Sequence, residues 1–170
     1  DQDDGQRDVL LTSCGEGNAG VLGVPELWHT AMLVNVIPGM PYEEWILGYS
    51  VGTQTNLLDD FDLDGMDHLV EYGLGGNPEI DDAASILPVS MLNAESNVFA
   101  YVYNRRRDAA FQGLSYTVRQ QDADLTLDSW TTNGITEAGV VVLDAEFEEV
   151  TATVPVDGDK KFMKLDIEKQ

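Results

Sequence analysis

Acidic side chains are concentrated between residues 59 and 71, where six carboxylates occur and no lysine or arginine. Asp60, Asp62 and Asp64 alternate along the chain, Gly65 follows, and Glu71 is the twelfth residue counted from Asp60. Carboxylates on alternate residues can converge on one cation, a glycine at the sixth position permits the sharp turn, and a glutamate at the twelfth can close the shell. The spacing is that of an EF-hand-type loop, and it predicts calcium binding.

The predicted calcium site takes side-chain oxygens from four residues and a main-chain carbonyl from a fifth. These are Asp60, Asp62, Asp64, Glu71 and, through its carbonyl, Met66. Calcium prefers oxygen ligands, so a transition metal is not expected. Asp59, Asp67 or water could complete the shell, and His68 is expected to reach the ion through water if at all. The alternative is a solvated acidic turn, in which the carboxylates would repel one another without a cation.

The charge balance of the whole chain is strongly negative. Its 31 acidic and 9 basic residues give a formal net charge of −22 at pH 7. Nucleic acids and anionic membrane surfaces both require clustered lysine and arginine, so neither is an expected partner. The longest apolar stretch, residues 27–40, is too short and too often interrupted to insert into a bilayer. This composition suits a divalent cation or a saline milieu.

The cellular compartment has to be inferred indirectly. The chain opens Asp-Gln-Asp-Asp, so no signal peptide is visible, and the chain is either cytosolic or a mature secreted form. The single cysteine, Cys14, allows no internal disulfide. It is either a small unreacted side chain or half of an intermolecular bridge. Taken with the calcium pattern, these features favour a secreted, extracellular protein.

Catalytic groups are few. The chain has two histidines and one cysteine, and Cys14 stands in no recognised nucleophile motif. Glycosidase chemistry requires two carboxylates that flank a cleft, and among 31 acidic residues no pair is singled out. The sequence therefore predicts a protein that is not an enzyme.

Residues 41–80 have the pattern of two helices joined by the acidic loop. One apolar stripe is formed by Tyr42, Trp45, Ile46 and Tyr49, and the second by Met66, Leu69, Val70 and Leu74. Glycines at 75 and 76 followed by a proline at 78 are typical of a helix end. We expect the two stripes to pack together and against the strands, with Trp45 largely buried.

Residues 86–170 change to the two-residue period of strands. Alternating segments occur around 98–103, 114–118, 150–154 and 163–167, and a short apolar run covers 140–143. Turn signals separate them at 112–113, 133–134 and 157–158. Five to seven strands at this spacing predict a mainly β fold, an antiparallel β-sandwich.

Residues 1–40 form an N-terminal arm with two short apolar segments. The residues singled out for assembly are Val9, Leu10, Leu11, Leu33, Val34 and Val36. Two strands cannot bury a core of their own, so the arm must pair with a sheet edge. Pairing within the chain would give a monomer, whereas pairing with a neighbour would give a homo-oligomer or a fibre.

A second group of residues could recognise a polysaccharide. Aromatic side chains and arginines of this kind can stack on and grip acidic sugars, and the candidates are Tyr101, Tyr103, Arg105, Arg107 and Trp130. The alternative is that the arginines pair with neighbouring acids and that the aromatic side chains belong to the core.

The order of these motifs resembles a known bacterial module. The matching stretches are Trp45–Tyr49, Asp60–Pro78, Tyr101–Asp108, Leu114–Val118, Ser129–Trp130 and Phe162–Leu165. They are similar to a C-terminal module, with the signature D-x-D-x-D-G…E-Y-x-L-G-x-x-P, of large secreted proteins from planctomycete- and verrucomicrobia-type bacteria. The resemblance covers roughly residues 42–168 and implies export, calcium, an antiparallel β-sandwich of fibronectin-like or jelly-roll-like type, and no catalysis. Such modules often end polysaccharide-degrading enzymes or surface proteins.

Two functions remain open at this point. The first is a secreted calcium-binding protein of extracellular structure that self-assembles by strand exchange. The second is a carbohydrate-binding accessory module of a polysaccharide-degrading enzyme.

Overall fold

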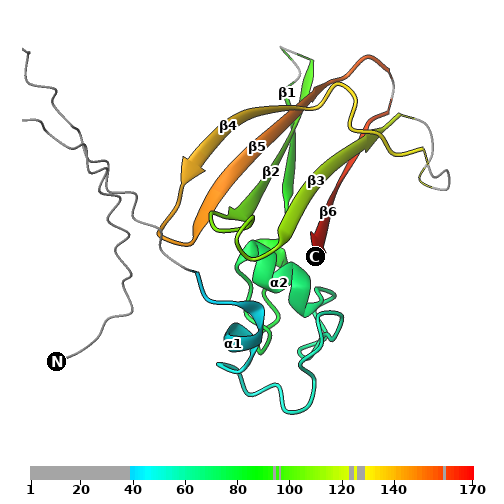
Figure 1. Ribbon diagram of the computed structural model, residues 1–170. Helices are drawn as coiled ribbons and strands as arrows, with labels where there is room; N and C mark the ends of the chain where they lie inside the picture. The colour runs from blue at the N-terminus through cyan, green and yellow to red at the C-terminus, as the bar shows by residue number, and fades with distance from the viewer. Residues whose placement is uncertain (1–38, 94, 96, 123–124, 126–128, 159) are drawn as a thin grey trace, which may run out of the picture. The chain divides into compact units, whose positions relative to one another are not determined.

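The computed structural model describes residues 39–93, 95, 97–122, 125, 129–158 and 160–170 (Figure 1). The chain divides into two units between residues 37 and 38. The strands predicted at 9–11 and 31–37 lie outside the described residues. The helical and strand segments predicted as separate regions, 41–80 and 86–170, belong to one and the same unit.

In the described part of the chain, three helices precede the strands. They are α1 (Tyr42–Ile46), α2 (His68–Leu74) and α3 (Ala83–Ile86). Helix α2 starts two residues later than the apolar stripe indicates, because the side chain of Asp67 caps it by accepting the N–H of Val70. The helix ends at Gly75, whose φ of 91° lies in the left-handed region, as the glycine-rich end predicts.

Six strands form two antiparallel sheets within the residues that the structure describes. They are β1 (Val89–Asn93), β2 (Val98–Arg106), β3 (Leu114–Gln121), β4 (Thr136–Val142), β5 (Phe147–Pro155) and β6 (Phe162–Lys169). The first sheet has the order β1-β2-β5-β4, and the second consists of β3 and β6. The predicted mainly β, antiparallel fold is confirmed, and β2 to β6 contain the predicted segments. Strand β1 and helix α3 were not predicted.

The two sheets share a core built from alternate residues of their strands. Tyr103 of β2, Val118 of β3 and Val150 of β5 belong to one buried cluster. The ring of Tyr103 stacks on that of Tyr116 from the second sheet, with centroids 6.3 Å apart. The period-two pattern of the sequence therefore places apolar side chains between the sheets.

A second core joins the helices to the sheets, and Tyr72 of α2 is its most buried aromatic residue. Its ring meets those of Tyr42 and Trp45 at centroid distances of 5.6 and 5.3 Å. Trp45 packs against this cluster with intermediate exposure, in the predicted contact between the two stripes, but Tyr72 is the better buried of the two. Gly73 lies so close to the second sheet that a Cβ there would come within 3.2 Å of Ile167.

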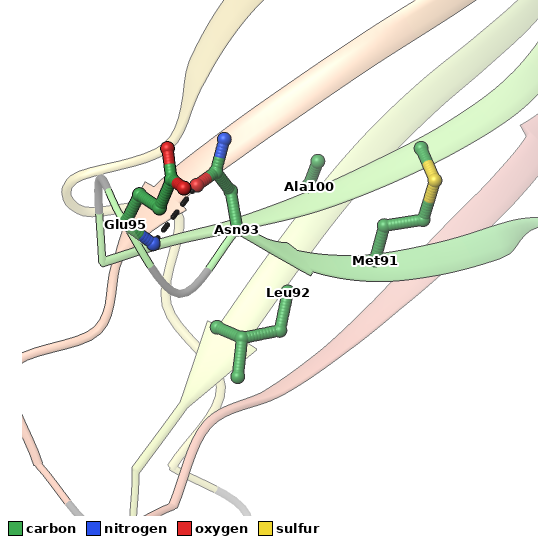
Figure 2. Close-up of a pocket in the computed structure, with 5 residues that line it drawn as sticks. All are labelled: Met91, Leu92, Asn93, Glu95 and Ala100. Atoms are coloured by element: carbon green, nitrogen blue, oxygen red, sulfur yellow. Dashed lines mark hydrogen bonds between the residues drawn. The ribbon is translucent and has the colours of Figure 1, made fainter.

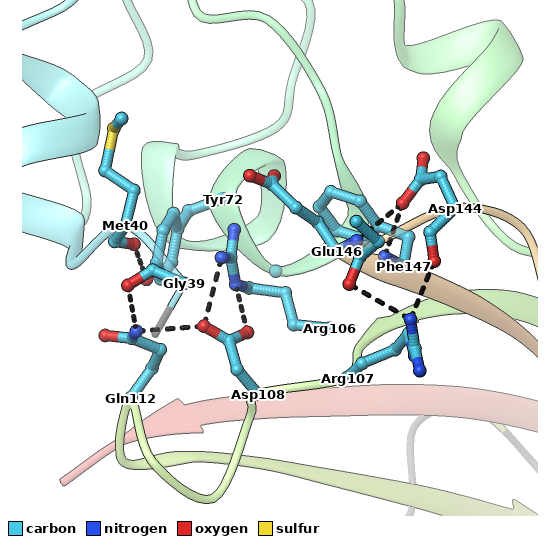
Figure 3. A network of polar contacts seen from close by, with 12 residues as sticks. Gly39, Met40, Tyr72, Arg106, Arg107, Asp108, Gln112, Asp144, Glu146 and Phe147 are labelled. Carbon is cyan, nitrogen blue, oxygen red and sulfur yellow. Dashed lines mark hydrogen bonds and ion pairs between the residues drawn. The ribbon is translucent and has the colours of Figure 1, made fainter. Parts of the chain in front are cut away.

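Arg106, at the end of β2, forms the polar centre of this junction (Figure 3). Its side chain is 2% exposed, pairs with Asp108 at 2.9 Å, and lies over the Tyr72 ring at 4.4 Å. The Tyr72 hydroxyl donates to the carbonyl of Met40, and the Gln112 amide donates to that of Gly39. These contacts fix the first described residues against α2 and the β2–β3 loop.

Replacing Tyr72 with alanine should destabilise the protein more than replacing Trp45 with alanine. Tyr72 is fully buried, so its truncation leaves a cavity that should cost about 3–5 kcal/mol. Trp45→Ala should cost less, because Trp45 is only partly buried. Phe111→Ala, at an exposed position, should change the free energy of unfolding by about 0.5 kcal/mol or less. Urea unfolding of the three variants measures this order, and a larger loss at Trp45 would contradict it.

Candidate metal centre

The loop between α1 and α2 brings three predicted ligands together. One carboxylate oxygen from each of Asp60, Asp62 and Asp64 lies within 4.8 Å of the other two. Oxygens that share one calcium ion at 2.3–2.6 Å can be at most about 5 Å apart, so this spacing suits a common ion. Gly65 has a φ of 93°, the left-handed turn that its position in the motif predicts.

Hydrogen bonds to the main chain hold the three aspartates in place. Asp60 accepts the N–H groups of Leu63 and Gly65. Asp62 accepts the N–H of Asp64 through one oxygen, while its other oxygen is buried and has no partner among the described residues. The loop thus aligns its carboxylates through its own backbone and leaves one oxygen unsatisfied.

Glu71 is the decisive residue of the site. It lies on α2, is 1% exposed, and neither carboxylate oxygen has a hydrogen-bond partner in the described part of the chain. Burial, which is the largest cause, and the nearby charges of Asp62 and Asp64 together raise the pKa of Glu71 to about 8. A buried carboxylate without a partner is costly, and a bound cation would compensate both its charge and its missing contacts.

Asp82 is a fourth acidic neighbour that the sequence pattern does not reveal. It precedes α3, and one of its oxygens is buried without a partner in the described residues. Burial raises its pKa, as do the charges of Asp64 and Asp62. Asp64 in turn accepts the N–H groups of Asp82 and Ala83 at 3.1 and 2.8 Å. Asp82 stands eleven residues beyond the last position of the loop motif, where no ligand spacing indicates it.

The remaining acidic and imidazole groups near the loop have other surroundings. Asp67 caps α2, and Asp59 accepts hydrogen bonds from the backbone and side chain of Asn56. Met66 is buried and donates its N–H to Asp64, so it lies beside the predicted ligands. His68 is fully buried, and neither ring nitrogen has a partner among the described residues.

The donor set therefore suits calcium. It offers hard carboxylate oxygens from the loop, α2 and the segment before α3, with unsatisfied oxygens on Asp62, Glu71 and Asp82. The residues that would hold the ion are Asp60, Asp62, Asp64 and Glu71, with the Met66 carbonyl and Asp82 as further oxygen donors. Bound there, calcium would supply positive charge and structural cross-linking.

The residues considered for polysaccharide binding make contacts within the protein. Arg105 pairs with Glu137 and Glu148, and Arg107 donates to the carbonyls of residues 144 and 145. Tyr103 is buried in the core, and the ring of Trp130 lies 5.0 Å from the ammonium of Lys164. Arg105 thus takes the alternative role foreseen for the arginines, whereas Arg107 bonds to main-chain carbonyls, and sugar binding stays a prediction.

Comparisons with known proteins add no relative. No protein-family model, no curated protein and no solved structure matches this chain. Among the described helices, none has the length and apolar character needed to cross a bilayer.

Glu71→Gln should change stability in opposite directions with and without calcium. In chelator at pH 7.5 the variant should melt higher than wild type, because a neutral amide replaces a buried carboxyl with a raised pKa. In millimolar calcium it should melt lower, because an anionic ligand is lost. Glu44→Gln, at an exposed position on α1, is the control. The same order of melting temperatures in both solutions would refute the assignment.

The same residue predicts a pH dependence for the calcium-free protein. The pKa of Glu71 is raised from 4.5 to about 8 in the folded chain, so the folded state holds the proton more tightly than the unfolded state. Stability in chelator should therefore fall as the pH rises across this interval, and fall less steeply in Glu71→Gln. Parallel pH profiles for the two proteins would contradict the expectation.

Proposed function

We propose that this chain is a non-enzymatic, calcium-binding structural protein of the cell exterior, whose copies associate through residues 1–40. The observation that carries the calcium part is the buried, unpartnered carboxylate of Glu71 beside the three aspartates of the loop. No partner for that charge is found in the described chain, and the surrounding groups are acidic. A divalent cation is the species that resolves this arrangement.

The proposed ion acts as a cross-link between segments. It connects the loop at 60–64, helix α2 and the segment that leads into α3. Helix α2 is attached to the sheets, because Gly73 accepts a hydrogen bond from the Tyr116 hydroxyl and Leu74 accepts one from the Asn104 amide. Calcium would therefore stabilise the junction between the helices and the sheets, as well as the loop itself.

An extracellular setting fits this chemistry. Calcium sites of extracellular modules work at dissociation constants of about 10⁻⁴–10⁻³ M, a concentration range that the cell interior does not supply. A net charge of −22 opposes random association, so assembly has to use specific contacts. The uncharged apolar segments at 9–11 and 31–37 are the parts of the arm suited to such contacts.

Calcium should raise the melting temperature of the full chain. A ligand that binds only the folded state stabilises it by about 2.7 kcal/mol at one hundred times its dissociation constant. For a domain of this size, the increase corresponds to about 5–10 °C. Differential scanning calorimetry in calcium, magnesium and chelator measures the shift. Identical unfolding in calcium and in chelator would exclude the site.

Deleting residues 1–38 should abolish association while leaving calcium binding intact. The deletion stops at residue 38, because Gly39 and Met40 make hydrogen bonds to Gln112 and Tyr72. Analytical ultracentrifugation of both chains in calcium measures their oligomeric state. If the full chain stays monomeric at high concentration, or the deletion leaves its assembly unchanged, the structural role is wrong and an accessory-module role replaces it.

A further inference from the structure

The smaller sheet leaves one of its two strands with an open edge. Strand β6 pairs only with β3 within the described residues. The other side of β3 is partly closed, because Gln120 exchanges two backbone hydrogen bonds with Thr131. The outer edge of β6, which we call the free edge, has no strand partner among the described residues, although the Tyr101 hydroxyl is hydrogen-bonded to its backbone at Leu165.

The register shows which backbone groups point outward from β6. Gln170 donates its N–H to Gly113, and in an antiparallel pair the bonded residues alternate. The even-numbered residues of β6 therefore form the backbone hydrogen bonds to β3. The backbone groups of Met163, Leu165 and Ile167 consequently face away from β3. A contact of the Tyr101 hydroxyl with the Leu165 backbone agrees with this direction.

The side chains of the same residues face the core but are only half-buried. Residues 163, 165 and 167 pack against the buried clusters, yet each keeps intermediate exposure. Beside them lies a hollow of ≈ 240 Å³ that also touches helix α2 and the residues that lead into β1. Its apolar lining includes Leu74, Leu87, Tyr101, Met163, Leu165 and Ile167. The hollow and the free edge together form what we call the β6 groove.

The inner face of the larger sheet also has an uncovered apolar side chain. Leu92 of β1 pairs across the sheet with Phe99, next to the pair of Ser90 with Tyr101, so it shares the inner face with Tyr101. Figure 2 shows Leu92 and Met91 on opposite faces of β1. Leu92 is 61% exposed, although its face points toward the second sheet.

The other open edges are poorer acceptors. Strand β4 carries an irregularity between Glu137 and Gly139, of the kind that discourages strand addition. Strands β1 and β4 are exposed along their whole length, so a strand added there would extend the larger sheet without filling a hollow. A strand beside β6 would instead cover half-buried core residues of both sheets.

We infer that the β6 groove binds residues 31–37 of a second copy of this chain as an added strand. This inference rests on the proposed self-association and names its acceptor. Residues 31–37 read Ala-Met-Leu-Val-Asn-Val-Ile, and Met32, Val34 and Val36 fall on one face of an extended strand. Three apolar side chains at two-residue spacing match the three half-buried residues of β6. Seven extended residues span about 23 Å, and eight residues of β6 about 27 Å.

Charge also favours this pairing. The segment 31–37 has no charged side chain, and the groove has one, that of Lys164. In a chain with a net charge of −22, an uncharged strand and a groove whose one charged lining residue is cationic let two molecules meet without adjacent negative charges. The backbone edge of β6 would form hydrogen bonds with the added strand, and the hollow would favour a strand with apolar side chains.

The start of the described chain lies near the end of β6. Gly39 is held by Gln112, and a Cβ at Gly39 would collide with Asp108 in the β2–β3 loop. Lys169 of β6 pairs with Glu43 at 3.6 Å. Only residue 38 separates the segment 31–37 from Gly39, so the experiment has to distinguish a strand from a second copy from a strand of the same molecule.

Cross-linking between two full-length variants tests the groove. In a Cys14→Ser background, an affinity-tagged Val34→Cys chain is mixed with an untagged Leu87→Cys chain in calcium and treated with a short bismaleimide. Leu87 lines the groove and is 45% exposed, so its replacement should spare the core. Leu58→Cys, 79% exposed and outside the groove, is the matched control. We expect a mixed dimer with Leu87→Cys at least tenfold more abundant than with Leu58→Cys.

The outcomes separate this inference from the proposed function. Equal cross-linking at residues 87 and 58 overturns the groove, even if deletion of residues 1–38 abolishes assembly. An intramolecular link in a Val34→Cys, Leu87→Cys double variant overturns the second copy as occupant, and links between two Leu87→Cys chains show edge-to-edge pairing instead. As a second measurement, Leu87→Glu should weaken association by about tenfold or more, and Leu58→Glu should not. Unchanged association of Leu87→Glu would also overturn the groove.

Discussion

The burial of the Glu71 carboxylate is the constraint on which this molecule depends. Helix α2 has only seven residues, and five of them are buried, so it has little exposed surface to give to a charged side chain. Glu71 faces the acidic loop, while its neighbours Tyr72 and Gly73 face the helical and sheet cores. The group that compensates the charge of Glu71 therefore determines how stably helix α2 packs against the sheets.

The second charge problem of the same region is resolved within the chain. Arg106 is as deeply buried as Glu71, but it has a carboxylate partner in Asp108 and two aromatic rings, those of Tyr72 and Phe147, near its guanidinium. A paired and hydrogen-bonded buried charge is tolerated, whereas an unpaired one is not. The contrast between the two residues is the strongest physical reason to place a cation at the acidic loop.

The sequence predicted those features that depend on local spacing. The loop aspartates, the left-handed Gly65, the helix end at Gly75 and five of the strands follow from short-range patterns. Features that depend on tertiary contacts were missed. Asp82 reaches the site from outside the motif, and the short strand β1 lacks a clear alternation of apolar residues because both of its faces are exposed. Trp45 has the larger side chain, yet Tyr72 is the better buried, because α2 lies between α1 and the sheets.

The hydrogen bonds at Gly39 and Met40 also define where a pulling force would enter this unit. A load applied through the preceding residues would act first on the bonds from Gln112 and Tyr72. Tyr72 directly follows Glu71 on α2, so the load would pass from Met40 into the helix that borders the acidic loop. Mechanical strength under tension would then be set by the same few residues as the charge balance of the loop, and it would vary with the ionic composition of the surroundings.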